Sequence, residues 1–142
     1  MPTRKASAIW EKGLKDGHGS FKGESGTVSG SYSFGSRFEH AAGSNPEELL
    51  AAAEAACFSM ALALGLEQNG TPAQKVETSA ACTVEKVGDG FKITTMSLVV
   101  NATVPGIDDA KFQQIAQRTK DGCPVSQALK GNVAITLAAK LS

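Results

Sequence analysis

The sequence has few histidine, cysteine and aromatic residues, and neither sign of charge is in excess. Among its 142 residues, 14 Lys and Arg balance 14 Asp and Glu, so the formal net charge is zero. Such a chain has neither the basic surface typical of nucleic-acid binding nor the acidic tail typical of disorder. Aromatic residues make up only 6% of the chain. Because Ala, Gly and Ser are plentiful, we expect tight packing of small side chains.

The motifs of several common site types are also missing. There is no Cys-x-x-Cys pair, and His18 and His40 have no partner at ligand spacing, which argues against zinc. His40 precedes Cys57 without an evident acid to orient it, so a Cys-His hydrolase is disfavoured. The chain has no Walker loop, dinucleotide fingerprint or nucleophile-elbow serine. We therefore expect neither a metal nor an organic cofactor.

The N-terminus lacks the apolar segment of a signal peptide. Three cysteines, an odd number without such a signal, suit the reducing cytoplasm better than a disulfide scaffold. The length allows one real core but not two, so we expect a single domain over residues 1–142.

The longest apolar run extends from Leu49 to Leu66 and contains one charged residue, Glu54. Its length is borderline for a membrane span. The interior acid, the many alanines and the lack of basic flanks or a second span favour a buried helix of a soluble protein. Asn45 and Glu48 form a box-like N-terminal cap, and Asn69–Gly70 supplies a left-handed C-terminal end. The run is therefore predicted to be a long central helix.

The rest of the chain alternates between strand and helix patterns. Residues 3–35 predict short strands with little apolar surface, which must pack on something else, such as another subunit. Residues 36–44 predict a loop. The later segments predict a long antiparallel hairpin, an amphipathic helix, a short helix and a last strand, at 75–104, 108–120, 124–129 and 133–140. We expect an α+β fold with antiparallel sheets around the central helix.

Each cysteine has a different expected environment. Cys82 lies on the apolar face of a strand and is expected to be a core residue. Cys123 precedes Pro124 at the start of a short helix, where free backbone N–H groups and the helix dipole favour a thiolate. A mere capping role for Cys123 stays open. Cys57 shares its helix face with apolar residues that are expected to form core, namely Leu50, Ala53, Met60, Ala61 and Leu64.

The spacing of Glu47 and Cys57 suggests how Cys57 could be activated. Glu47 lies about 80° around the helix from Cys57, so it can reach that face while Glu48 caps the helix. A carboxylate alone would oppose a thiolate, but one that holds Arg37 would place a guanidinium near the sulfur. Glu54 would oppose the thiolate as well, unless its side chain points to solvent.

Three segments closely resemble the OsmC/Ohr family, the osmotically inducible protein C and organic hydroperoxide resistance proteins of bacteria. They are Asn45-Pro46-Glu47-Glu48-Leu49-Leu50, Ala55-Ala56-Cys57-Phe58-Ser59-Met60-Ala61-Leu62 and Gly122-Cys123-Pro124-Val125-Ser126. The segments Ala8-x-Trp10, Ser36-Arg37-Phe38-Glu39 and Val104-Pro105-Gly106-Ile107 look like the OsmC branch. The likeness covers essentially the whole chain in one register.

The resemblance implies a cysteine peroxidase that reduces organic hydroperoxides, and hydrogen peroxide less readily, without a cofactor. It implies that Cys57 is the peroxidatic cysteine, that Cys123 resolves it as a disulfide, and that Arg37 and Glu47 complete the site. It further implies an intertwined homodimer recycled by dithiols such as lipoyl groups. Glu54 falls where we expect the family to vary, so we attach no role to it. The competing class is a non-enzymatic stress or binding protein with redox-regulatory cysteines.

Overall fold

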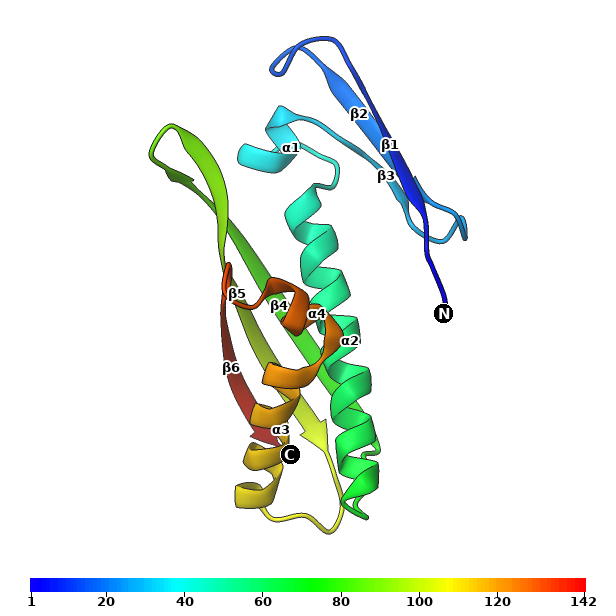
Figure 1. Ribbon diagram of the computed structural model, residues 1–142, viewed down its shortest axis with the longest axis vertical. Helices are drawn as coiled ribbons and strands as arrows, with labels where there is room; N and C mark the ends of the chain where they lie inside the picture. Colours follow the sequence, from blue (N-terminus) through cyan, green and yellow to red (C-terminus); the bar gives the residue numbers. More distant parts are fainter. The chain divides into compact units, whose positions relative to one another are not determined.

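The computed structural model describes residues 1–142, which form two compact units, residues 1–49 and 50–142. Strands come first, followed by the long helix α2 (Pro46–Gln68), which continues from one unit into the other (Figure 1). The α+β fold expected from the sequence is confirmed. The single domain over residues 1–142 stays a prediction.

The first unit contains an antiparallel meander. Its strands are β1 (Ala6–Glu11), β2 (His18–Gly23) and β3 (Ser29–Tyr32), in that spatial order. Gly26 lies in the turn between β2 and β3 with a φ of 78°, a left-handed conformation that glycine adopts without strain. The buried apolar residues of the protein all lie outside this unit. The prediction that the meander has little core of its own is therefore confirmed.

A short helix, α1 (Phe34–Phe38), occupies part of the segment predicted as a loop. The prediction was wrong here because two serines cap each other reciprocally. The backbone N–H of Ser36 donates to Ser33 Oγ at 3.0 Å, and the backbone N–H of Ser33 donates to Ser36 Oγ at 2.8 Å. This exchange satisfies N–H groups that a helix start otherwise leaves unpaired. It places Arg37 in the last turn of α1.

Helix α2 begins and ends where the sequence predicts. The backbone N–H of Glu48 donates to Asn45 Oδ1 at 2.7 Å, which identifies Asn45 as the cap. At the other end Gly70 has a φ of 82° and donates to the carbonyl of Glu67 at 2.9 Å. By length and composition α2 is long and apolar enough to cross a membrane. In the structure, 22% of its most apolar 18-residue stretch is buried. Much of its apolar surface is thus left uncovered by this chain.

The second unit is built on a mixed sheet with the order β4-β5-β6. β4 (Lys75–Val87) and β5 (Gly90–Thr103) form the predicted antiparallel hairpin, while β6 (Ala134–Leu141) pairs with β5 in parallel. The connection from β5 to β6 contains α3 (Asp109–Gly122) and α4 (Pro124–Leu129). A parallel pair needs such a crossover connection.

The core of the second unit lies on one face of this sheet, against α2 and α3 (Figure 1). Its fully buried members include Phe58 and Leu62 of α2, Leu98 and Val100 of β5, and Phe112 of α3. The buried residues of α3 are Phe112, Ile115, Ala116 and Thr119, on one side of the predicted amphipathic helix.

Gly65 sets how closely α3 approaches α2. A Cβ atom added at Gly65 would lie 3.0 Å from Ile115 Cγ2, tighter than ordinary side-chain contacts. The missing side chain therefore allows the two helices to pack at short range.

The two faces of β5 give a matched test of how the core of the second unit is packed. Leu98 is fully buried, whereas its neighbour Val99 is 54% exposed on the opposite face. Leu98→Ala should lower the free energy of unfolding by about 2–5 kcal/mol because it leaves a cavity. Val99→Ala should change it by less than about 0.5 kcal/mol. Denaturant unfolding measures both, and equal losses would contradict this description of the core.

Candidate active site

Cys57 lies halfway along α2, at the border between its buried and exposed sides. The buried side carries Glu54, Phe58 and Leu62. The prediction that Met60 and Leu64 are core neighbours of Cys57 is wrong, because they are 79% and 53% exposed. Only part of the circumference of α2 contacts the sheet and α3. The apolar residues on the rest of α2 are therefore exposed.

Cys57 borders a hollow of about 570 Å3 whose lining is mainly apolar. The other lining residues are Met60, Ala61, Ala63, Leu64, Glu67, Pro72, Ala73 and Pro124. The half-buried thiol is therefore accessible from a space that suits hydrocarbon groups.

Cys123 is held at the junction of α3 and α4. Its backbone N–H donates to the carbonyl of Thr119 at 2.9 Å, which ends α3. Its Sγ accepts from the backbone N–H of Ser126 at 3.4 Å, which caps α4. With Pro124 in the first turn, Cys123 is the N-cap residue that the sequence predicts. Unlike Cys57, it is almost completely buried, with 2% of its surface exposed.

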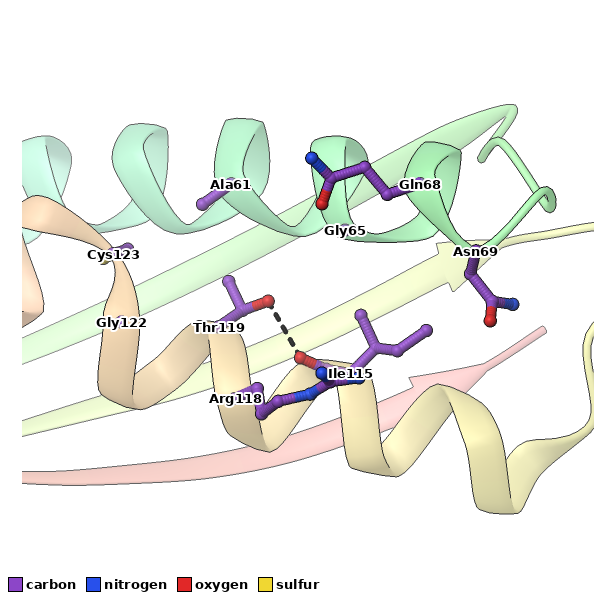
Figure 2. Close-up of a pocket in the computed structure, with 9 residues that line it drawn as sticks. All are labelled: Ala61, Gly65, Gln68, Asn69, Ile115, Arg118, Thr119, Gly122 and Cys123. Carbon is purple, nitrogen blue, oxygen red and sulfur yellow. Dashed lines mark hydrogen bonds between the residues drawn. The ribbon is translucent and has the colours of Figure 1, made fainter.

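The fold brings the two cysteines together across a long stretch of sequence. Both are thiols, and the side chain of Cys57 lies near enough to Cys123 to be among the causes that raise the Cys123 pKa. The contact arises because α3 runs alongside α2 and ends with Cys123 against it (Figure 2). The third cysteine, Cys82, packs on the sheet core as predicted.

Glu54 lies beside this thiol pair and is fully buried. Its side chain does not point to solvent, as it would have to do to leave a Cys57 thiolate unopposed. Its Oε1 accepts from Ser126 Oγ at 2.5 Å and from Cys123 Sγ at 3.5 Å. Its Oε2 is buried without a hydrogen-bond partner. Glu54 is turned inward because it occupies the α2 face that contacts α4, between the helix and the Cys123 turn.

Burial raises the pKa of the Cys123 thiol above its ordinary value. The hydrogen bonds from the side chain and backbone of Ser126 lower that pKa, whereas the contact with Cys57 and the negative charge of Glu54 raise it further. The expectation that the helix start favours a Cys123 thiolate is wrong, because desolvation outweighs the donors of a helix only six residues long. At neutral pH Cys123 is a thiol.

Arg37 and Glu47 form a bidentate ion pair within the first unit. Arg37 Nε lies 3.1 Å and 3.2 Å from the two Glu47 carboxylate oxygens, and Nη2 lies 2.8 Å from Oε1. The Glu47 side chain is 7% exposed and that of Arg37 is 35% exposed. The guanidinium carbon also lies 5.2 Å from the centre of the Phe38 ring. The pairing predicted from helix geometry is confirmed, and Glu48 is left to the helix cap.

The two halves of the predicted site lie in different units, Arg37 and Glu47 in the first and both thiols in the second. No group of three or more His, Cys, Asp or Glu side chains is arranged to hold a metal ion. In the second unit the Cys123 thiol lies beside the Glu54 carboxylate and the Ser126 hydroxyl group.

A second hollow, of about 400 Å3, lies between α2 and α3 (Figure 2). Cys123 and Arg118 both contribute to its lining, and Thr119 donates a hydrogen bond to the Ile115 carbonyl at 2.9 Å beside it. Cys57 and Cys123 thus border different hollows.

Comparison with known proteins identifies the family. Residues 39–138 match the family described as OsmC-like protein. The chain belongs to the OsmC-like family. This OsmC-like protein is 45% identical to peroxiredoxin OsmC of Escherichia coli over 133 residues, which cover 93% of each chain. It is 37% identical to the organic hydroperoxide resistance protein OhrB of Bacillus subtilis, over 69% of this chain and 71% of OhrB.

Solved structures show the same fold. The crystal structure of Bacillus subtilis OhrB matches 96% of this OsmC-like protein and 98% of its own chain, with a TM-score of 0.74 and 28% identity. An organic hydroperoxide resistance protein OsmC from Legionella pneumophila matches with a TM-score of 0.75 and 22% identity, over 99% and 98% of the two chains. The resemblance inferred from the sequence motifs is confirmed.

Sequence reasoning missed Ser126 and the placement of Glu54. Ser126 stands three residues after Cys123, a spacing at which the serine at N3 faces the N-cap side chain. Glu54 is the one charged residue of a long apolar run. A lone acid on a buried helix needs donors, and this signal could have indicated an internal contact.

The raised pKa of Cys123 predicts a pH dependence of stability. Above the ordinary thiol pKa the unfolded chain releases a proton that the folded chain keeps, so the free energy of unfolding falls as the pH rises. Cys123→Ala and Cys123→Ser should both flatten this fall between about pH 8 and pH 10. Denaturant unfolding under reducing conditions measures the slope. Variants as steep as the wild type would contradict the raised pKa.

Proposed function

We propose that this OsmC-like protein is a thiol peroxidase that reduces organic hydroperoxides to alcohols. Its relatives are named as a peroxiredoxin and as organic hydroperoxide resistance proteins. The single observation that carries the proposal is the contact between the Cys57 and Cys123 side chains. A peroxidase that ends its cycle as a disulfide needs a resolving thiol within reach of the peroxidatic one.

Cys57 is the peroxidatic cysteine in this proposal. Its thiolate attacks one peroxide oxygen, the O–O bond breaks, and the alkoxide leaves as an alcohol after it gains a proton. Cys57 is left as a sulfenic acid. Cys123 then attacks that sulfur, so that a disulfide forms and water leaves. An external dithiol, for which lipoyl groups are our candidate, reduces the disulfide by exchange and is itself oxidised.

Arg37, held in place by Glu47, supplies positive charge where the O–O bond breaks. The two-pronged hold of Glu47 fixes the guanidinium plane, and the exposed part of Arg37 remains available for a further acceptor. A guanidinium fixed in advance stabilises the charge that develops on the leaving oxygen.

The hollow beside Cys57 supports an apolar substrate. Met60, Leu64 and Pro72 line it, so an alkyl or lipid hydroperoxide is favoured over hydrogen peroxide. The same exposed apolar face of α2, together with a first unit that lacks buried apolar residues, supports a homodimer in which a second copy covers these surfaces. We further propose that the whole chain acts as one domain and works in the cytoplasm, where cysteines stay reduced.

A non-enzymatic stress or binding protein is the competing function. Intact mass under non-reducing conditions separates the two after one equivalent of cumene hydroperoxide. Loss of two hydrogen atoms, mapped to a Cys57–Cys123 disulfide, supports the peroxidase. An unchanged mass supports the alternative.

Substitution of each cysteine should stop the cycle at a different step. Cys57→Ser should reduce cumene hydroperoxide turnover to the uncatalysed background, because no peroxidatic thiol remains. Cys123→Ser should allow one turnover and then leave Cys57 open to overoxidation, visible as added oxygen by mass spectrometry. Cys82→Ser serves as the control and should retain turnover. Sustained dithiol-driven turnover by Cys123→Ser would exclude a resolving role.

Loss of the Arg37 side chain should slow the first step. Arg37→Ala should lower the rate of Cys57 oxidation by about 10²–10³-fold, as for other fixed donors to developing charge. Arg37→Lys should restore part of the rate, since the charge remains without the planar fork. Arg4→Ala, an exposed arginine of the same unit, is the control. Stopped-flow kinetics with equimolar hydroperoxide measures the step, and a wild-type rate in Arg37→Ala would remove Arg37 from the site.

A further inference from the structure

The burial of Glu54 is costly for folding and needs an explanation. Its side chain is fully buried in an apolar stripe of α2 that includes Phe58 and Leu62. Burial of a carboxylate is unfavourable unless donors or cations compensate it. No ion pair includes Glu54, and its Oε2 has no hydrogen-bond partner. A neutral residue would serve the packing better, which points to a chemical role.

Glu54 and Ser126 contact each other, and both contact the sulfur of Cys123. Its Oε1 lies 3.5 Å from Cys123 Sγ and 2.5 Å from Ser126 Oγ. Ser126 Oγ in turn lies 3.0 Å from Cys123 Sγ. A proton on Cys123 can thus reach the carboxylate directly or through the Ser126 hydroxyl group.

The proposed cycle creates a need for such an acceptor. When Cys123 attacks the Cys57 sulfenic acid, a sulfur–sulfur bond forms and the sulfur–oxygen bond breaks. Cys123 must lose its proton, and the departing hydroxide must gain one. Burial raises the pKa of Cys123, so little of it is ionised beforehand at neutral pH. The step therefore needs a base in contact with Cys123.

We propose that Glu54 is the general base of disulfide formation, with Ser126 as its relay. The inference rests on the proposed peroxidase function and deepens it. Glu54 accepts the Cys123 proton as the sulfur–sulfur bond forms, and this proton then passes to the departing hydroxide, which leaves as water. The Cys57 sulfur is reduced, the Cys123 sulfur is oxidised, and Glu54 returns to its carboxylate form.

A backbone N–H group also contacts the Cys123 sulfur. The N–H of Ser126 donates to Cys123 Sγ at 3.4 Å and can stabilise the negative charge on sulfur as the proton leaves. The polar or ionisable groups around Cys123 are Glu54 and Cys57 of α2 and Ser126 of α4, and Arg118 of α3 lines the same hollow. Among these, Glu54 is the one in contact with Cys123 that can accept a proton as a carboxylate.

Two roles of Glu54 predict opposite effects of its removal. If its charge merely repels a Cys123 thiolate, a neutral residue should make disulfide formation faster. If it is the base, the neutral residue should make this step slower. Glu54→Gln keeps the shape of the side chain, and Glu48→Gln, at an exposed position of the same helix, is the matched control.

The experiment follows the two steps separately. Reduced protein is mixed with one equivalent of cumene hydroperoxide and quenched at intervals with an alkylating reagent, and mass spectrometry counts sulfenic acid and disulfide. Glu54→Gln should oxidise Cys57 at least as fast as the wild type but form the disulfide about 10²-fold more slowly. Its disulfide rate should rise steeply with pH, because attack must await a Cys123 thiolate, whereas the wild-type rate should change little between about pH 6 and pH 8.

The outcomes separate this inference from the proposed function. Disulfide formation in Glu54→Gln at or above the wild-type rate, or with the wild-type pH profile, overturns the role of Glu54. Failure of the wild-type protein to oxidise Cys57 overturns the peroxidase itself. Ser126→Ala keeps the carboxylate and serves if Glu54→Gln does not fold. It should slow disulfide formation alone, and a wild-type rate in Ser126→Ala would overturn the relay.

Discussion

The packing of α2 and α3 side by side on the sheet is the interaction on which the second unit depends. Phe58 and Leu62 of α2 belong to the same core cluster as Phe112 of α3, and all three are fully buried. Gly65 permits the close approach, since a Cβ there would crowd Ile115. Because α3 ends beside α2, the same packing that forms the core also brings Cys123 to Cys57.

This packing gives the two cysteines different properties. Cys57 lies at the border of the core and opens onto an apolar hollow, whereas Cys123 is 2% exposed. Desolvation keeps the Cys123 proton in place despite two hydrogen bonds from Ser126. A thiol that stays protonated is protected from direct oxidation by peroxide, because the thiolate is the form that attacks the peroxide oxygen.

Sequence patterns predicted most elements correctly, for local reasons. The caps at Asn45 and Gly70 depend on side chains and backbone angles within a few residues, so they could be recognised without the fold. The expected pairing of Glu47 with Arg37 likewise joins residues only 10 positions apart. The patterns failed where a contact decided the outcome, as at Met60, which is exposed because α2 has neighbours on only part of its circumference.

The sequence by itself determined most of the elements, the family and the identity of the first candidate site residues, because motifs and caps are local. Only the tertiary structure decided that Glu54 and Ser126 belong beside Cys123, since their contacts join α2 to α4 across the fold. It also decided the protonation state of Cys123. A helix start favours a thiolate locally, but the degree of burial depends on everything packed around the sulfur, and here desolvation is the larger effect.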